Sequence, residues 1–107
     1  MLPNMMEQRE AANASLRGLM AEATCEHFKG LVKVAEPTSK VCDQCVEMGD
    51  RWVHLRSCLI CGAVGCCDNS KNRHARLHYQ TEGHPLIRSI EPLEFWRYCF
   101  EDNVLAR

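Results

Sequence analysis

The spacing of cysteines and histidines constrains this chain of 107 residues more than any other feature. Two pairs of cysteines have two residues between their members, and two histidines one helical turn apart follow them: Cys42 with Cys45, Cys58 with Cys61, and His74 with His78. A two-residue gap lets one tight turn present both sulfurs to one ion, and thiolates with imidazoles suit zinc. The spacing therefore predicts a domain whose fold depends on bound zinc.

Disulfide bonds are the other common use of eight cysteines. The first ten residues, Met1 to Glu10, lack the basic and apolar regions of a secretory signal, and no apolar run approaches the ~20 residues that span a bilayer. Because histidines are interleaved with the cysteines, metal binding is favoured over disulfides. We therefore expect a cytoplasmic protein with no membrane association.

The length and the net charge of the chain further narrow the classes of protein and partner that fit it. The length fits one domain with a short extension, and a core of this size gains from metal ligation. The 13 basic and 14 acidic residues give a formal net charge of -1. That balance provides no general attraction to nucleic acid or to an anionic membrane surface.

The pattern divides the chain into an N-terminal helical extension, residues 1–23, and a zinc domain, residues 24–107. Residues 5–23 are rich in Ala, Glu, Met and Leu with an approximate apolar stripe, which predicts a helix. Residues 24–45 have an irregular pattern, with a short strand at 31–34. Strands are expected within 51–60, 87–90 and 95–100. The segment 70–83 predicts a helix that Asn69 or Ser70 caps and Gly83 ends.

The fold class expected from these elements is α+β, a small zinc-stapled domain with a twisted antiparallel sheet and a helix that carries two ligand histidines. The order of the ligands suggests two cross-braced zinc sites. Site one comprises Cys42, Cys45, Cys66 and His74, and site two comprises Cys58, Cys61, His78 and His84. Each site closes long loops, which is how a small domain gains most from metal. The ordinary alternatives are a solvated helix face for His74 and His78, and a capping role for His84.

Four further residues leave a third zinc site open: Cys25, His27, Cys99 and Asp102. Aspartate is an acceptable zinc ligand but is rarer than cysteine in structural sites. In the alternative, these residues pack or hydrogen-bond without metal, so the sequence predicts two zinc ions and leaves a third undecided. Cys67, next to a ligand, is expected to be a buried small apolar residue, and His54 a histidine outside the sites.

These motifs resemble the UBP-type zinc finger of ubiquitin-specific proteases and of a histone deacetylase. The resemblance covers roughly residues 24–103 and rests on Cys25-x-His27, Cys42-x-x-Cys45, Trp52, Cys58-x-x-Cys61-Gly62, Cys66, His74-x3-His78-x5-His84-Pro85 and Tyr98-Cys99-Phe100. The segments Val64–Asp68 and Asn72–Ala75 most resemble small stand-alone bacterial members. The last pair departs from the Cys-x-x-Cys of three-zinc members, because Asp102 replaces the second cysteine.

The resemblance implies a pocket that binds the free C-terminal Gly-Gly tail of ubiquitin, with Trp52, Tyr98 and Phe100 on its aromatic wall. In the family an arginine pairs with the terminal carboxylate. Asp68 stands at that arginine's position, so the usual tail recognition should fail. Arg73 or Arg76 could compensate, although a solvated helical charge is their ordinary interpretation. A bacterial origin would also leave no ubiquitin to bind.

Three classes of function compete. We favour a non-catalytic zinc module that binds a protein or a peptide tail at Trp52, Tyr98 and Phe100, whose ordinary alternative is core packing. The second class is a nucleic-acid-binding zinc module with a basic patch of Lys71, Arg73, Arg76 and Arg88, against which the balanced charge argues. The third is an enzyme, and only the third cluster could keep an open metal position. We expect no enzymatic activity, and we do not expect ubiquitin or nucleic acid as partner.

Overall fold

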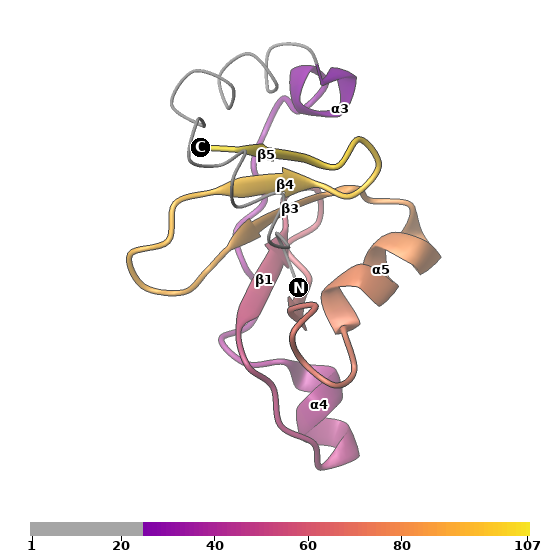
Figure 1. The fold of residues 1–107 in the computed structure, drawn as a ribbon, viewed down its shortest axis with the longest axis vertical. Helices are drawn as coiled ribbons and strands as arrows, with labels where there is room; N and C mark the ends of the chain where they lie inside the picture. Colours follow the sequence, from indigo (N-terminus) through magenta and orange to yellow (C-terminus); the bar gives the residue numbers. More distant parts are fainter. Residues whose placement is uncertain (1–24) are drawn as a thin grey trace.

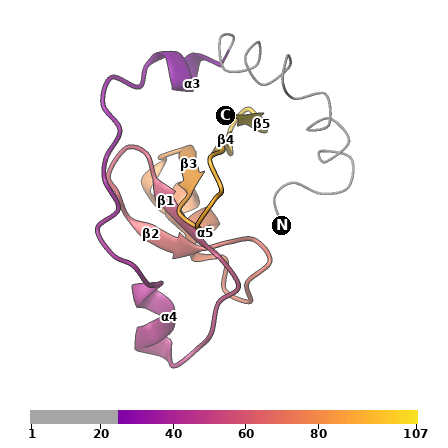
Figure 2. The same cartoon turned by 90° about the vertical axis from the view of Figure 1, so that its left-hand side faces the viewer.

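The computed structural model describes residues 25–107, and the predicted helix over residues 5–23 lies outside them. Five antiparallel strands form one sheet in the order β2-β1-β3-β4-β5. The strands are β1 Leu55–Cys58, β2 Val64–Cys66, β3 Leu86–Ser89, β4 Arg97–Cys99 and β5 Val104–Ala106, and the helices are α3 Glu26–Lys29, α4 Asp43–Met48 and α5 His74–Glu82. Figures 1 and 2 show α3 and α4 at opposite ends of the long axis. Within this range no helix has the length and apolarity to cross a membrane.

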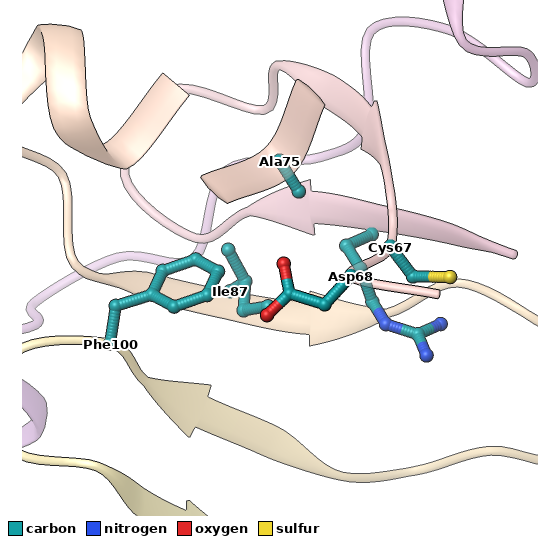
Figure 3. Close-up of a pocket in the computed structure, with 6 residues that line it drawn as sticks. Cys67, Asp68, Ala75, Ile87 and Phe100 are labelled. Carbon is teal, nitrogen blue, oxygen red and sulfur yellow. The ribbon is translucent and has the colours of Figure 1, made fainter. Parts of the chain in front are cut away.

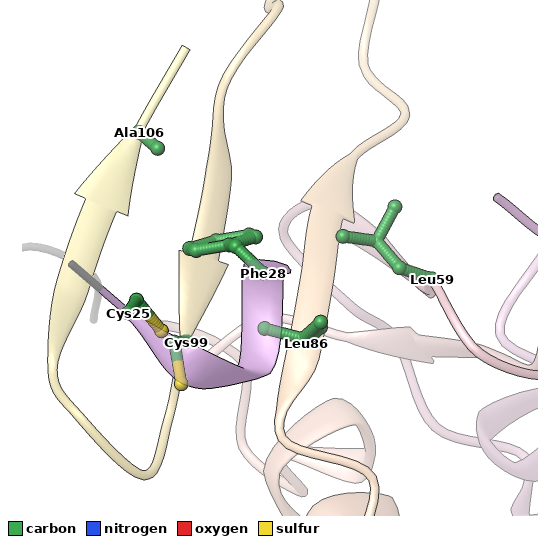
Figure 4. Packing of buried hydrophobic residues seen from close by; sticks show 6 residues of the cluster. All are labelled: Cys25, Phe28, Leu59, Leu86, Cys99 and Ala106. Carbon is green, nitrogen blue, oxygen red and sulfur yellow. The ribbon is translucent and has the colours of Figure 1, made fainter. Parts of the chain in front are cut away.

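One face of the sheet packs against α3. Leu86 and Cys99 are directly paired on β3 and β4 and point to this face, where Phe28 of α3 covers them. Figure 4 shows Phe28 standing beside the strands near Leu86. This cluster also contains Cys25, Leu59 and Ala106. The apolar core therefore includes Cys25 and Cys99, which the sequence left as possible ligands of a third zinc site.

The opposite face carries α5. Alternation along a strand sends Ile87 and Tyr98 to the side opposite Leu86 and Cys99. The helix approaches β2 at Gly65, where a β-carbon would lie 2.5 Å from the Ala75 backbone nitrogen. Glycine is therefore required at position 65 for this close packing, which brings the start of α5 to the end of β2.

The helix α5 confirms the predicted segment but begins later than expected. Its N-cap is Arg73 in the left-handed region, with φ 48°, rather than Asn69 or Ser70. The Ser70 hydroxyl instead accepts a hydrogen bond from the Val53 backbone N–H at 2.9 Å. Gly83 ends the helix in the left-handed region, as predicted, with its N–H bonded to the Tyr79 carbonyl.

The predicted strand over residues 31–34 is wrong, and a bend at Lys33 interrupts the segment. Its Val32 side chain is 98% exposed, whereas Leu31 and Val34 pack on the core. The Ala35 N–H bonds the Leu59 carbonyl, but no ladder forms along the segment. Burial does not alternate along the segment, because Val32 and Lys33 are both exposed between the half-buried Leu31 and Val34.

Candidate metal centres

Site one brings together the four predicted residues, Cys42, Cys45, Cys66 and His74, all of them buried. Cys42 lies immediately before α4 and Cys45 lies within its first turn, so a single turn presents both sulfurs. Cys66 ends β2, and His74 begins α5. The close approach at Gly65 places these last two residues together, since it joins β2 to the start of α5.

The distances in site one fit a tetrahedral zinc ion. Zinc–sulfur bonds of about 2.3 Å and zinc–nitrogen bonds of about 2.0 Å imply tetrahedral edges of about 3.8 Å between sulfurs and about 3.5 Å between sulfur and nitrogen. The Cys45 and Cys66 Sγ atoms lie 3.8 Å apart. His74 Nδ1 lies 3.2, 3.4 and 3.5 Å from the sulfurs of Cys42, Cys45 and Cys66. The donor set and its spacing therefore fit the ion.

Site two gathers Cys58, Cys61, His78 and His84, also as predicted, nearer the surface. Cys58 Sγ lies 3.6 Å from His84 Nδ1, and Cys61 Sγ lies 3.3 Å from His78 Nε2. The Ile60 N–H donates to Cys58 Sγ at 3.4 Å, a contact that favours a thiolate. His84, whose alternative was a capping role, joins the cluster.

The third cluster brings Cys25, His27, Cys99 and Asp102 together. Asp102 Oδ2 lies 2.9 Å from Cys25 Sγ and 3.0 Å from His27 Nδ1. Tetrahedral edges to a zinc-bound oxygen would be about 3.5 Å from sulfur and about 3.3 Å from nitrogen. The two contacts of Asp102 are shorter than these edges and are those of hydrogen bonds, whereas Cys99 Sγ lies 3.5 Å from His27 Nδ1, at the sulfur–nitrogen edge. The aspartate side chain is also 38% exposed.

Burial opposes ionisation of the ligand thiols. It raises the pKa of Cys42 to about 12 and that of Cys99 to about 11, and it raises the pKa values of Cys58 and Cys66 as well. A bound cation is what stabilises thiolates in such surroundings. Burial, followed by the neighbouring His84, lowers the pKa of His78, which favours the neutral imidazole that a metal requires.

The remaining cysteine and histidine are placed as non-ligands. Cys67 is 3% exposed and lies outside the three clusters, as predicted for a small buried residue. Burial alone would raise its pKa, but hydrogen bonds with Ser70 and backbone groups, and the charge of Arg56, lower it overall. The His54 carbonyl accepts the Cys67 N–H, and its ring belongs to none of the clusters in residues 25–107.

The aromatic residues proposed for a peptide cleft do not all meet. Tyr98 and Phe100 contact edge to face with ring centroids 5.5 Å apart, and Tyr98 is buried. The structure places Trp52 elsewhere, packed against the buried cluster that contains Cys42, Cys45 and Cys66. Trp52 therefore supports site one, whereas Phe100 lies at a small cavity.

This cavity has a volume of about 10 Å³ and is lined by Arg56, Cys67, Asp68, Ala75, Ile87 and Phe100. Figure 3 shows the Asp68 carboxylate inside it, between Phe100 and Cys67. Arg76 donates to both Asp68 oxygens, at 2.7 to 3.2 Å, and lies 4.7 Å above the Phe100 ring. The expectation of a solvated charge at Arg76 is therefore wrong, because this side chain lies against the buried Asp68 carboxylate.

Sequence reasoning missed Arg56 at this cavity and Trp96, whose ring lies beside this arginine. Arg56 is 6% exposed, lies 4.5 Å over the Trp96 ring and has an Nε atom without a hydrogen-bond partner. Its burial lowers its pKa, against the opposing charges of Cys67 and Glu94. An arginine within a strand whose four residues are all buried was the available signal.

The fold and its three clusters define a small α+β zinc-finger domain. A family model described as "Zn-finger in ubiquitin-hydrolases and other protein" matches residues 42–107. The chain therefore belongs to the UBP-type zinc-finger family.

Relatives of known name agree with this membership. Ubiquitin carboxyl-terminal hydrolase 45 of Mus musculus is 30% identical over 101 residues, covering 75% of this chain and 12% of that protein. Histone deacetylase 6 of Caenorhabditis elegans is 29% identical over 87 residues, covering 77% of this chain and 8% of that protein. The chain thus spans only about a tenth of the length of these relatives.

A bacterial protein of similar size shares the fold. The solution NMR structure of protein RPA1320 from Rhodopseudomonas palustris has 41% sequence identity and a TM-score of 0.70. The match covers 77% of this chain and 79% of that chain.

Proposed function

We propose that this chain is a non-catalytic module whose fold is held by zinc in sites one and two, and whose surface binds a peptide or protein segment. The proposal that zinc holds the fold is supported by the composition of the core. The largest fully buried side chains are Leu59, Leu86, Ser57 and five cysteines, Cys42, Cys45, Cys58, Cys66 and Cys99. With so few large apolar side chains fully buried among residues 25–107, the metals supply much of the folding free energy of this part of the chain.

The third cluster, which contains Cys25, His27, Cys99 and Asp102, is proposed to bind zinc more weakly than sites one and two. Its aspartate already accepts short contacts from Cys25 and His27, which a metal would have to replace. Native mass spectrometry on protein purified without added metal tests the assignment, with two retained ions expected and a third that a mild chelator removes first. Fewer than two ions, or three of equal retention, would contradict it.

The absence of catalysis is inferred from the ligand sets. Four protein ligands complete a zinc tetrahedron and leave no position for a substrate or an activated water. Site one is also buried at all four ligands. The need to keep the ligand thiols reduced is the basis for placing the protein in the cytoplasm.

The expected ligand is not a free C-terminal tail. Asp68 is only 8% exposed at its side chain and is paired with Arg76, so this arginine is already satisfied and the Asp68 carboxylate occupies the place that an incoming carboxylate would need. The remaining space admits about one water molecule. Calorimetric titration of the zinc-loaded domain with ubiquitin, and with a peptide ending in a free Gly-Gly carboxylate, should give no binding heat at millimolar concentration. A free-acid peptide that binds while its amide does not would refute this part.

The nucleic-acid alternative is not favoured. Of the four basic residues named for a patch, three are paired with acids in the structure: Lys71 with Asp50, Arg76 with Asp68, and Arg88 with Glu36. Such pairing cancels the field that draws a phosphate backbone. A salt-dependent mobility shift of a random oligonucleotide would reverse this conclusion.

A further inference from the structure

The Asn72 side chain joins site one to the loop that follows α4. Its amide nitrogen Nδ2 lies 3.7 Å from Cys45 Sγ and 3.0 Å from Asp50 Oδ2. Both partners accept hydrogen bonds when Cys45 is a metal-bound thiolate and Asp50 is a carboxylate, and an amide NH2 group has two hydrogens to donate. The chemistry of the two acceptors therefore fixes the amide with its nitrogen toward the sulfur.

Each cysteine sulfur of site one has a hydrogen-bond donor beside it. The Cys45 backbone N–H donates to Cys42 Sγ, and the His74 backbone N–H donates to Cys66 Sγ at 3.2 Å. The sulfur of Cys45 receives its hydrogen bond from a side chain, that of Asn72. Backbone donors survive most substitutions, whereas the donor to Cys45 depends on the residue type at position 72.

The charge of site one gives this donor a physical purpose. Three thiolates and one neutral imidazole around a divalent ion leave an excess negative charge, whereas the two thiolates of site two balance the ion. All four ligands of site one are buried, so protein donors must take the place of water around this charge. A buried charge costs free energy unless hydrogen bonds compensate it.

The carboxylate of Asp50 is placed to hold the amide in this orientation. It accepts the second hydrogen of Asn72 and lies 3.7 Å from Lys71 Nζ, and the Asp50 side chain is only 29% exposed. Groups outside the ligand set that orient and hydrogen-bond the ligands affect the affinity of a metal site. Asp50 can act on the sulfur in this way through Asn72.

From these contacts we propose that Asn72 is a positioning residue for zinc at site one, where its amide stabilises the Cys45 thiolate, and that Asp50 orients this amide. The proposal rests on the proposed zinc binding at site one and assigns two further residues to the retention of that ion. In the alternative, the contact between Asn72 and Asp50 only ties the loop before α5 to the loop after α4, and the thiolate is unaffected.

Cobalt(II) in place of zinc distinguishes these roles, because the sulfur-to-cobalt charge-transfer band reports on the thiolates themselves. Loss of a hydrogen bond raises the energy of the sulfur lone pairs and moves this band to longer wavelength. Zinc affinity is measured separately, by competition with a chromogenic chelator. Circular dichroism of the full chain at saturating metal establishes that each variant is folded.

Asn72→Leu is the main variant, because leucine keeps a similar branched shape and excludes water but has no donor. Asn69→Leu is the matched control, at an exposed asparagine of the same connection between β2 and α5. Asp50→Ala and the double variant with Asn72→Leu test whether the carboxylate acts through the amide.

Asn72→Leu should lower the zinc affinity of site one about 10- to 100-fold and move the cobalt band to longer wavelength. Asp50→Ala should show both changes to a smaller extent. The double variant should match Asn72→Leu, because the carboxylate has no amide left to orient. Asn69→Leu should match the wild type in both measurements.

Wild-type affinity in Asn72→Leu, or a lower affinity with an unshifted band, would overturn the proposal, since the second result is that of a purely structural contact. If Asn72→Leu does not fold at saturating metal, Asp50→Ala decides, and wild-type affinity and band in that variant would overturn the proposal. A wild-type chain that binds no metal at site one would overturn the proposed function as well.

Discussion

Replacing Gly65 by alanine should weaken zinc binding at site one without touching a ligand. The added β-carbon would lie 2.5 Å from the Ala75 nitrogen and 2.8 Å from the His74 carbonyl carbon. To reach even a tight contact of 3.0 Å, the start of α5 must retreat by roughly half an ångström. Metal–ligand distances tolerate only about 0.2 Å, so His74 would be drawn out of position.

The expected loss of zinc affinity in Gly65→Ala follows from the cost of overpacking, about 1–3 kcal/mol. At about 1.4 kcal/mol per tenfold change, zinc affinity at site one should fall roughly 5- to 150-fold. Competition with a chromogenic chelator measures this affinity, and thermal unfolding of the zinc-loaded protein should show a lower midpoint.

Gly30→Ala is the matched control for this substitution. A β-carbon at position 30 would lie 3.4 Å from the Glu26 carbonyl oxygen, an ordinary contact, and the φ of Gly30 is -78°. We expect this variant to keep wild-type zinc affinity. If Gly65→Ala also kept wild-type affinity and midpoint, the close helix–strand approach would not be what positions His74.

Other changes test the metals and the buried ion pair. Removing zinc with excess chelator should abolish the sharp thermal transition, and Cys58→Ser should do the same in circular dichroism, because folding and metal binding share one free energy. Asp102→Ala should leave the two tightly held zinc ions in native mass spectra but lower retention of any third, and a loss of the first two would contradict the site assignment. Asp68→Asn should cost about 1–3 kcal/mol in urea unfolding, because it takes the charged partner from Arg76. Arg76→Gln should then add little in the double variant, whereas full additivity would show that the pair does not interact.

The grouping of metal ligands was accessible from sequence because it depends on order and spacing. A Cys-x-x-Cys turn and two histidines at i and i+4 are local geometry, and the interleaved order of the segments allowed the cross-braced grouping that the structure brings together. The histidine helix was likewise predictable from its length and its terminal Gly83. Its start was not, because Arg73 takes a left-handed conformation that its residue type disfavours.

The short helices that follow cluster cysteines and the shortest strands could not be predicted from the sequence. The helices α3 and α4 have four and six residues, and each follows a cysteine of a cluster rather than a capping side chain. The strands β2 and β5 have three residues each, too few for a period to be recognised. The Asp68–Arg76 pair joins a loop to a helix, and no local rule relates these two positions.

The four-residue interval between His74 and His78 has a consequence for how zinc binds to and dissociates from the two sites. One turn of α5 delivers an imidazole to each of two separate sites, so a shift of the helix at one site is felt at the other. Linkage then requires reciprocity: whatever factor the first ion contributes to affinity for the second, the second contributes to the first. If binding at one site favours the helix position that the other site needs, the two ions load and release together, and the domain responds to small changes in free zinc.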